Sequence, residues 1–176
     1  MSLRCAQLEH PSPWVQRFAR TIPAGGPVLD VACGSGRHAR LLAGLGYRVA
    51  AVDRDAEAIA ALTALPGIEA RVADLEQDVW PFPGRRFAGV VVTNYLHRPL
   101  FPALLDSIAE AGVLIYETFA RGNERYGRPA NPDFLLEPGE LLRVAAGRMR
   151  VLAYEDLFVE EPKPAMVQRI CAVREV

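Results

Sequence analysis

Seven consecutive residues, Asp30-Val31-Ala32-Cys33-Gly34-Ser35-Gly36, place a carboxylate shortly before two glycines. Glycines allow the backbone to approach a ligand closely, and the free N–H groups of a following helix attract polar or anionic groups. The carboxylate of Asp30 would repel a pyrophosphate, whereas it suits a positively charged group. The turn therefore predicts a nucleotide-like ligand with a cationic end.

Two further acids are spaced as a nucleoside site requires. Asp53 ends an apolar run and is placed to accept from both hydroxyls of a ribose. Asp74, within Ala73-Asp74-Leu75, can accept from an adenine amino group while the next backbone N–H serves a ring nitrogen. The glycines, Ala39 and Asp53 also fit the dinucleotide fingerprint, in which an acid follows ~20 residues downstream. A nicotinamide cofactor and S-adenosylmethionine (SAM) are both open at this point.

The elements that must position these residues alternate in type. Apolar runs predict strands and amphipathic spacing predicts helices between them, which indicates a parallel sheet with right-handed crossovers. The predicted strands are residues 28–31, 48–52, 69–73, 87–93 and 112–118, and the predicted helices are residues 37–45, 56–65 and 100–109. After a further helix at 138–146, only a short loop joins the runs 150–158 and 167–173, so we expect these two to pair antiparallel.

This terminal hairpin, together with Asp30 and Asp74, favours SAM over a nicotinamide cofactor. The usual dinucleotide domain lacks such a hairpin. A dehydrogenase also needs a substrate domain, and a chain of 176 residues leaves none for it. A nicotinamide-dependent dehydrogenase is therefore the weaker interpretation.

The composition restricts the class of protein further. A length of 176 residues, of which 51% are hydrophobic, indicates one domain with a sizeable core. A net charge of −1 gives no strong field for nucleic acid or an anionic membrane. Three scattered cysteines predict neither a disulfide framework nor a zinc site, and we expect no bound metal. No signal peptide or membrane span is recognisable, so a cytoplasmic location is expected.

Residues 28–36, Val52-Asp53 and Ala73-Asp74-Leu75 resemble the class I SAM-dependent methyltransferases, and the resemblance covers essentially the whole chain. Residues 94–98, 116–119 and 122–127 are similar to small bacterial methyltransferases of the tellurite-resistance and thiopurine type. The resemblance implies an α/β fold, a Rossmann-like three-layer sandwich around a seven-stranded, mostly parallel sheet with an antiparallel last strand. It also implies an enzyme, a SAM-dependent methyltransferase that releases S-adenosylhomocysteine (SAH).

Two positions depart from the family pattern. Ala32 stands where a third glycine is common, and we expect a negative φ at this alanine that keeps the shape of the loop. Ala88 stands where an acid commonly opens the fourth strand. The predicted division is an N-terminal helical cap at 1–26, a SAM-binding core at 27–118, a lid loop at 119–137, and a helix with the terminal hairpin at 138–176.

By resemblance, ten residues are assigned to the cofactor. They are Asp30, Ala32, Gly34 and Gly36 at the amino-acid end of SAM, Asp53 at the ribose, Arg54, Asp74 and Leu75 around the adenine, and Asn94 and Tyr95 near the methionine portion and the transferring methyl. Arg37 and His38 open the first helix and either contact the SAM carboxylate or cap the helix at the surface. Trp14 and Phe18 either cover SAM or simply pack together.

The methyl acceptor is expected to be a small molecule with a sulfur, selenium, tellurium, oxygen or nitrogen nucleophile. Its candidate contacts lie near the carboxyl ends of strands and in the loop at 119–137, where α/β sheets bind ligands. They are Arg98, Glu117, Arg121, Tyr126 and Arg128, with Tyr95 and His97 as catalytic candidates.

Each acceptor contact has a plainer alternative. Histidine exchanges a proton most readily near neutral pH, so His97 is a candidate base, although a hydrogen-bonded structural histidine fits equally. Glu117 either orients an amine or forms an ion pair. The arginines of the loop suit a lid over an anionic acceptor, or a solvated surface loop.

Two other functions stay open beside small-molecule methyl transfer. The first is an RNA or protein methyltransferase, against which the near-neutral charge and the absence of a basic recognition module speak. The second is a non-catalytic SAM-binding module. We expect a monomer or a homodimer that does not associate with membranes.

Overall fold

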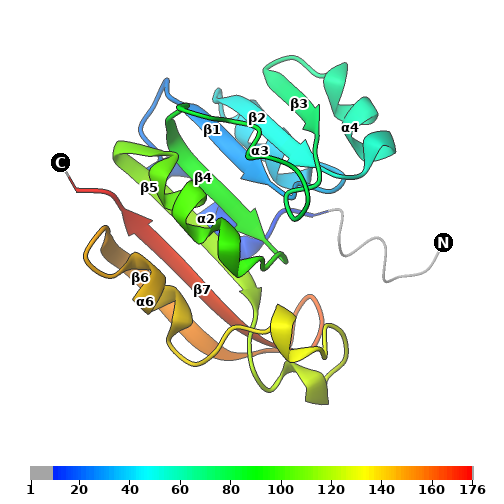
Figure 1. The fold of residues 1–176 in the computed structure, drawn as a ribbon, viewed down its shortest axis with the longest axis vertical. Helices are drawn as coiled ribbons and strands as arrows, with labels where there is room; N and C mark the ends of the chain where they lie inside the picture. Colours follow the sequence, from blue (N-terminus) through cyan, green and yellow to red (C-terminus); the bar gives the residue numbers. More distant parts are fainter. Residues whose placement is uncertain (1–9, 176) are drawn as a thin grey trace.

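The computed structural model describes residues 10–175 and shows a seven-stranded sheet with helices on both faces (Figure 1). The strands are β1 (Pro27–Val31), β2 (Arg48–Asp53), β3 (Ile68–Val72), β4 (Phe87–Thr93), β5 (Ile108–Phe119), β6 (Arg150–Val159) and β7 (Ala165–Val173). The α-helices are α2 (Pro13–Phe18), α3 (Arg37–Gly44), α4 (Ala56–Thr63), α5 (Phe101–Asp106) and α6 (Glu140–Ala145). Short 3-10 helices are η1 (Ala19–Thr21), η2 (Arg98–Leu100), η3 (Asn123–Arg125) and η4 (Pro132–Phe134).

The strand order β3-β2-β1-β4-β5-β7-β6 puts the first strand in the middle of the sheet. Strands β1 to β5 pair in parallel, and β7 is antiparallel to both β5 and β6. The predicted Rossmann-like sheet with an antiparallel last strand is therefore confirmed. Since parallel strands end at the same edge, the glycine turn, Asp53 and Asn94 come together there.

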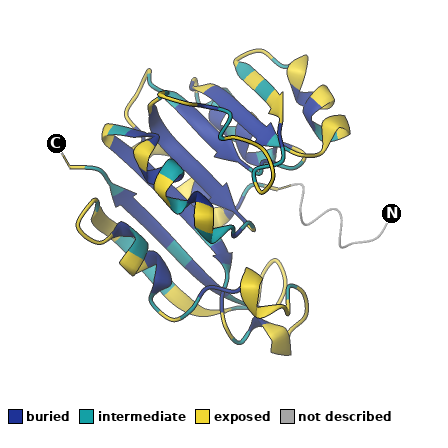
Figure 2. Cartoon of the chain, viewed as in Figure 1, coloured by how far each residue is buried: buried dark blue, intermediate teal, exposed yellow. Residues whose placement is uncertain are grey.

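Two hydrophobic clusters cover the two faces of the sheet. On one face Trp14 of α2, Leu42 of α3 and Leu62 of α4 pack against the sheet, and on the other face Leu104 of α5 and Leu141 of α6 do so. Figure 2 shows the central strands buried between these layers, with exposed residues on the outer sides of the helices and on β6. The arrangement gives the sheet a rigid frame with a ligand edge at its carboxyl ends.

The connection from β3 to β4, residues 73–86, contains no helix, and aromatic side chains cover the sheet in its place. Phe82 is 1% exposed and meets Phe87 edge to face at 5.6 Å between ring centroids. Trp80 contacts Phe82 in the same manner at 5.7 Å. These rings supply the apolar area that a crossover helix would bury.

The helix predicted at 100–109 is wrong at its end. Helix α5 stops at Asp106, and β5 begins at Ile108, with a shift of register between Phe87 and Gly89 of the neighbouring strand. A Cβ at Gly112 would lie 2.9 Å from the carbonyl oxygen of Phe87, so the backbones approach too closely for a side chain. The spacing of apolar residues in the sequence does not reveal such an irregular strand start.

Residues 14–22 of the N-terminal segment pack on one face of the sheet. The Trp14 indole N–H donates to the Ile170 carbonyl at 3.2 Å, and the ring meets Phe18 edge to face at 4.7 Å. The Tyr47 hydroxyl is bonded to the carbonyl of Ile22 at 2.8 Å. Part of the predicted cap, residues 1–9, lies outside the described residues. Among the residues that are described, no helix has the length and hydropathy needed to cross a membrane.

Candidate functional site

A cavity of about 260 Å³ opens at the carboxyl edge of the sheet, where the loops after β1, β2, β3 and β4 meet. Six of the ten residues predicted for the cofactor line it: Ala32, Asp53, Arg54, Asp74, Leu75 and Tyr95. Ala73, Glu76 and Phe134 complete the lining. We call it the nucleoside cavity, because an acid from each of two neighbouring strand ends faces it.

The glycine turn bends through left-handed backbone at three of its residues. Ala32 has φ 51°, Gly34 has φ 53° and Gly36 has φ 78°. The expected negative φ at Ala32 is wrong, since this residue adopts the conformation for which glycine is favoured, at a cost of ~1–2 kcal/mol for a residue with a Cβ. Strain of this kind concentrates at functional sites.

A side chain would meet different surroundings at the two glycines of the turn. A Cβ at Gly36 would collide with the methyl groups of Leu62, so this glycine lets α4 pack against the turn. A Cβ at Gly34 would meet nothing within 4 Å. Gly34 therefore leaves room at the edge of the sheet, while the contact of Gly36 is with the core.

Asp53 is fixed by the backbone around it. One carboxylate oxygen accepts from the Gly34 N–H at 2.7 Å and the other from the Asp55 N–H at 2.9 Å. Each oxygen keeps a further lone pair for a ligand hydroxyl. The hydrogen bond to Gly34 joins the turn after β1 to the end of β2, so one displaced element would displace the other.

Asp30 is buried beneath the turn without a hydrogen-bond partner. The residue is 1% exposed, and neither carboxylate oxygen is satisfied by a donor from the described residues. Burial raises the pKa of Asp30 to about 7, and the nearby backbone N–H of Ala39 and the charge of Arg37 offset only part of this rise. An unpaired buried carboxylate is costly, so the site fits a ligand that brings a positive charge.

The loop after β3 holds Asp74 in a tight turn. Its N–H donates to the Asp78 carboxylate at 2.7 Å, and one of its carboxylate oxygens accepts from the Glu76 N–H at 3.0 Å. The second oxygen of Asp74 is free of contacts within this turn. Asp74 therefore offers a second carboxylate acceptor to the nucleoside cavity, beside that of Asp53.

Asn94 and Tyr95 follow β4 at the centre of the edge. Asn94 has φ 53°, a conformation that asparagine adopts more readily than most residues. The Tyr95 hydroxyl is buried and has no hydrogen-bond partner among residues 10–175, and burial together with Glu76 and Asp74 raises its pKa to about 12. The hydroxyl therefore stays protonated near neutral pH, and the Tyr116 hydroxyl holds the Tyr95 carbonyl at 2.7 Å.

A second cavity of about 230 Å³ adjoins the first, and Glu76, Tyr95 and Phe134 line both. We call it the aromatic cavity. Its other lining residues are Asn94, Leu96, Thr118, Phe119 and Pro129. Sequence reasoning missed Glu76, Leu96, Thr118, Phe119, Pro129 and Phe134 as site residues. Three of these six lie in the predicted lid loop, whose path over the edge has no periodic signal in the sequence.

Arg98, predicted as a substrate contact, lines neither cavity and ties the lid loop to α6. Its guanidinium donates to both carboxylate oxygens of Glu140, at 2.7 and 2.9 Å, and to the carbonyls of Asp133 and Leu135, at 2.8 and 2.9 Å. Burial alone would raise the pKa of Glu140, but the hydrogen bonds from Arg98 hold it below its usual range. We call this set of bonds the Arg98 clamp. It holds both neighbours of Phe134, which faces the two cavities.

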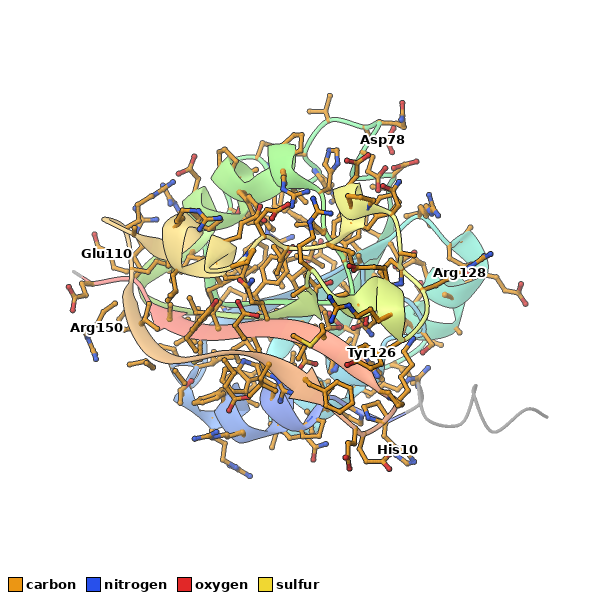
Figure 3. The ribbon with its side chains drawn as sticks, turned by 90° about the horizontal axis from the view of Figure 1, so that it is seen from below. His10, Asp78, Glu110, Tyr126, Arg128 and Arg150 are labelled. Carbon is orange, nitrogen blue, oxygen red and sulfur yellow. The ribbon has the colours of Figure 1, made fainter. Side chains whose placement is uncertain are left out.

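The other predicted substrate contacts also lie outside both cavities. Arg121 forms an exposed ion pair with Glu137 at 2.6 Å. The Tyr126 ring packs against Phe158 of β6 in the terminal hairpin, with 4.8 Å between the ring centroids. Figure 3 shows Tyr126 next to this hairpin. Arg128 is exposed. His97 is half-buried and lines neither cavity, and its role as a base stays a prediction.

Glu117 belongs to a buried polar group on the α2 and α3 side of the sheet. It accepts from the Ser12 hydroxyl at 2.7 Å and pairs with Arg169 at 3.3 Å, so its ion-pair interpretation fits the structure. His38 is 1% exposed, and its Nε2 accepts from the Ser12 N–H at 2.9 Å. Burial lowers the pKa of His38 to about 3, so the expectation of surface capping is wrong for this residue.

The sequence matches the profile of the family described as "Methyltransferase domain" over residues 5–150. No curated protein sequence matches the chain significantly.

Solved structures with the same fold are numerous. TehB from Haemophilus influenzae has 19% identity and a TM-score of 0.73, and the match covers 93% of this chain but 61% of TehB. A SAM-dependent methyltransferase from Methanosarcina mazei has 17% identity and a TM-score of 0.70, over 95% of this chain and 99% of that one. The glycopeptide N-methyltransferase MtfA complexed with SAH has 17% identity and a TM-score of 0.63, over 92% and 88%.

Proposed function

The chain belongs to the methyltransferase domain family, whose members of this fold use SAM, and we propose that it transfers the SAM methyl group to a small-molecule acceptor. The observation that carries the proposal is the unpaired, buried carboxylate of Asp30 beneath the glycine turn. It matches the ammonium group at the amino-acid end of SAM, which lies beyond the nucleoside part of that molecule.

The residues of the nucleoside cavity supply the remaining contacts. We assign the ribose hydroxyls to Asp53 and the adenine amino group to Asp74, with Leu75 and Arg54 beside the ring. Ala32 and Gly34 give the amino-acid end its path toward Asp30, and Asn94 and Tyr95 lie nearest the transferring methyl. Gly36 supports the turn through its contact with Leu62.

SAM, when bound, supplies a methyl group on a sulfonium that is already a good leaving group. The chain's own contribution is therefore to hold donor and acceptor in line, and proximity of this kind can supply ~7–11 kcal/mol. Tyr95 and Phe134 line both cavities, so they border the point where donor and acceptor meet. The protonated Tyr95 hydroxyl can donate a hydrogen bond there but does not act as a base near neutral pH.

The domain division and the cellular setting belong to the same proposal. We assign residues 27–118 to cofactor binding, 119–137 to a lid and 138–176 to the helix and hairpin that support the lid. Cys33 and Cys171 are buried and free, which suits a reducing, cytoplasmic setting. A monomer or a homodimer fits this proposal.

Calorimetry with SAM, SAH and NAD tests the cofactor. We expect SAM and SAH to bind and NAD not to bind, and binding of NAD alone would overturn the proposal. Asp53→Ala should weaken SAM binding by ~1–3 kcal/mol, because a charged acceptor with fixed geometry is lost. Glu57→Gln is the matched control, since it removes an exposed acid in the first turn of α4 that lines neither cavity. An equal loss in both variants would remove Asp53 from the site.

A further inference from the structure

We propose that the aromatic cavity binds the methyl acceptor and selects molecules with a flat, uncharged apolar body over anionic ones. The inference rests on the proposed function, since it needs SAM in the nucleoside cavity. It differs from the anionic acceptor that the arginines of the lid loop suggest from sequence.

The position of the aromatic cavity suits an acceptor. Glu76, Tyr95 and Phe134 line it together with the nucleoside cavity, so ligands in the two cavities lie next to each other. Its volume of about 230 Å³ is sufficient for one substituted ring, because an apolar cavity of ~150 Å³ already holds benzene. The two cavities therefore suit a donor and an acceptor in contact.

The lining favours an apolar body. Leu96 is buried, the rings of Phe119 and Phe134 face the cavity, and Pro129 adds a further apolar surface. Flat apolar surfaces pack well against such rings. Asn94 and Thr118 supply neutral polar groups that can orient a nucleophile, so a polar group on one side of the ring is accommodated.

No lysine or arginine is among the residues that line the aromatic cavity in residues 10–175. The Arg98 clamp and the Arg121–Glu137 pair occupy two nearby guanidinium groups. The Lys163 ammonium lies 5.1 Å from the centroid of the Phe119 ring and donates to the Arg128 carbonyl at 3.4 Å. Arg98 and Arg121 are thus paired with carboxylates outside the cavity, and Lys163 lies against Phe119 without lining the cavity itself.

Glu76 is the one charged residue among those that line the aromatic cavity in residues 10–175, and of the four charged residues that line the nucleoside cavity only Arg54 is positive. Glu76 lines both cavities, and Asp53 and Asp74 line the nucleoside cavity beside it. Carboxylates on one side of a cleft repel an anion and add no cost for a neutral molecule. A body that carries its own carboxylate would therefore be disfavoured twice, by repulsion and by burial against the rings.

The chemical step needs no further reactant. The acceptor's lone pair forms a bond to the methyl carbon, the carbon–sulfur bond breaks, and its electron pair stays on sulfur as SAH forms. The acceptor's proton passes to water at the open mouth of the cavity. This route fits a site in which no histidine is among the lining residues of either cavity in the described chain.

A matched pair of thiols tests the selectivity with the full chain. After SAM binding is measured by calorimetry, SAH formation is followed with 4-methylbenzenethiol, 4-mercaptobenzoate, selenite and tellurite. We expect kcat/KM for the methyl compound to exceed that for the carboxylate by roughly tenfold or more, with little turnover of the oxyanions. Equal or better use of the carboxylate or of an oxyanion would overturn the proposed selectivity.

Variants at Phe119 and Lys163 test whether the acceptor binds in the aromatic cavity. Phe119→Ala should lower kcat/KM for 4-methylbenzenethiol by roughly tenfold, because an apolar contact is lost, and leave SAM affinity within about twofold. Lys163→Met, which removes the cation on the same ring, should leave both unchanged. The reverse pattern would show that Lys163 recognises the acceptor. Thermal melts of both variants show whether the fold is intact, and Phe119→Leu restores part of the contact.

Calorimetry of SAH-loaded protein with 4-methylbenzenethiol gives a readout without turnover. Binding that Phe119→Ala weakens supports the proposal, and no binding overturns it. If SAM itself fails to bind, the proposed function is overturned. If SAM binds but anions are preferred, only the acceptor class is wrong.

Discussion

The two adjoining cavities of this protein are built in different ways. The nucleoside cavity rests on strand ends, with carboxylates and left-handed backbone close to β1, β2 and β4. The aromatic cavity combines the segment after β4 and the end of β5 with Pro129 and Phe134 of the lid loop, and apolar side chains form much of its lining. Under the proposed function, strand ends supply most of the donor contacts, whereas the lid loop adds Pro129 and Phe134 to the acceptor contacts.

The largest expected effect concerns cofactor binding through the buried carboxylate of Asp30. Asp30→Asn should weaken SAM binding by ~1.5–3 kcal/mol, because a charge-assisted contact is lost, while the fold keeps a side chain of the same shape. Calorimetry measures the affinity, and a thermal melt at pH 8 should show that the free variant is at least as stable as the parent chain. Unchanged SAM affinity would exclude Asp30 from the site.

The next effect concerns the Arg98 clamp, which holds the neighbours of Phe134 in a wall shared by both cavities. Arg98→Met should destabilise the protein by about 2 kcal/mol, since Glu140, whose side chain is 12% exposed, loses its partner and two carbonyls lose their donors. Because Phe134 is one of nine lining residues of the nucleoside cavity and one of eight of the aromatic cavity, both the acceptor KM and the SAM Kd should rise. Urea unfolding, steady-state kinetics and calorimetry measure the three quantities. Arg121→Met is the control. Both side chains of the Arg121–Glu137 ion pair are exposed, so the pair contributes less than about 1 kcal/mol to stability. Equal effects of the two changes would mean that the clamp has no special role.

A third prediction concerns the pH dependence of the free energy of unfolding, to which the buried groups Asp30 and His38 contribute with opposite sign. Asp30, with its pKa raised to about 7, keeps its proton in the folded chain when the unfolded chain has lost it, so its contribution makes stability fall as pH rises from about 4 to about 7. His38, with its pKa lowered to about 3, stays neutral when the unfolded chain gains a proton, so its contribution makes stability fall as pH drops below about 6.5. The two slopes oppose each other between about pH 4 and 6.5.

Denaturant unfolding across this range is the measurement. The parent chain should show a shallow dependence, because each group contributes at most about 1.4 kcal/mol per pH unit with opposite sign. Asp30→Asn should leave the His38 slope, with stability rising toward pH 6.5. A variant that shows the same curve as the parent would contradict the assigned titration of Asp30. SAM affinity of the parent should rise with pH through about 7, because the charged carboxylate is the form that pairs with an ammonium.

The smallest effect concerns strain in the turn. Ala32→Gly should stabilise the free protein by ~0.5–1 kcal/mol, because the residue sits at φ 51° and glycine adopts that conformation without a steric cost. This corresponds to a rise in Tm of about 2 °C for a domain of this size. SAM affinity should change by less than about twofold. A fall in Tm would show that the left-handed alanine is not strained.

Sequence reasoning predicted the sheet, its antiparallel last strand and most of the nucleoside cavity. These features follow from local rules, since glycine turns and acids at strand ends mark a ligand edge wherever the chain is parallel. It failed where tertiary contacts decide. The start of β5 depends on a close approach to Phe87, the partners of Arg98 come from residues far along the chain, and Phe134 reaches the edge because that clamp holds it. The roles of the individual site residues stay predictions.

The Arg98 clamp has a consequence for the entropy of binding. One guanidinium with four hydrogen bonds fixes the segment around Phe134 when the protein folds, so this wall of the site is ordered before any ligand arrives. A binding site that is already ordered loses little conformational entropy on association. The acceptor should therefore bind with a small entropic penalty, and loosening the clamp should transfer that penalty from folding to binding.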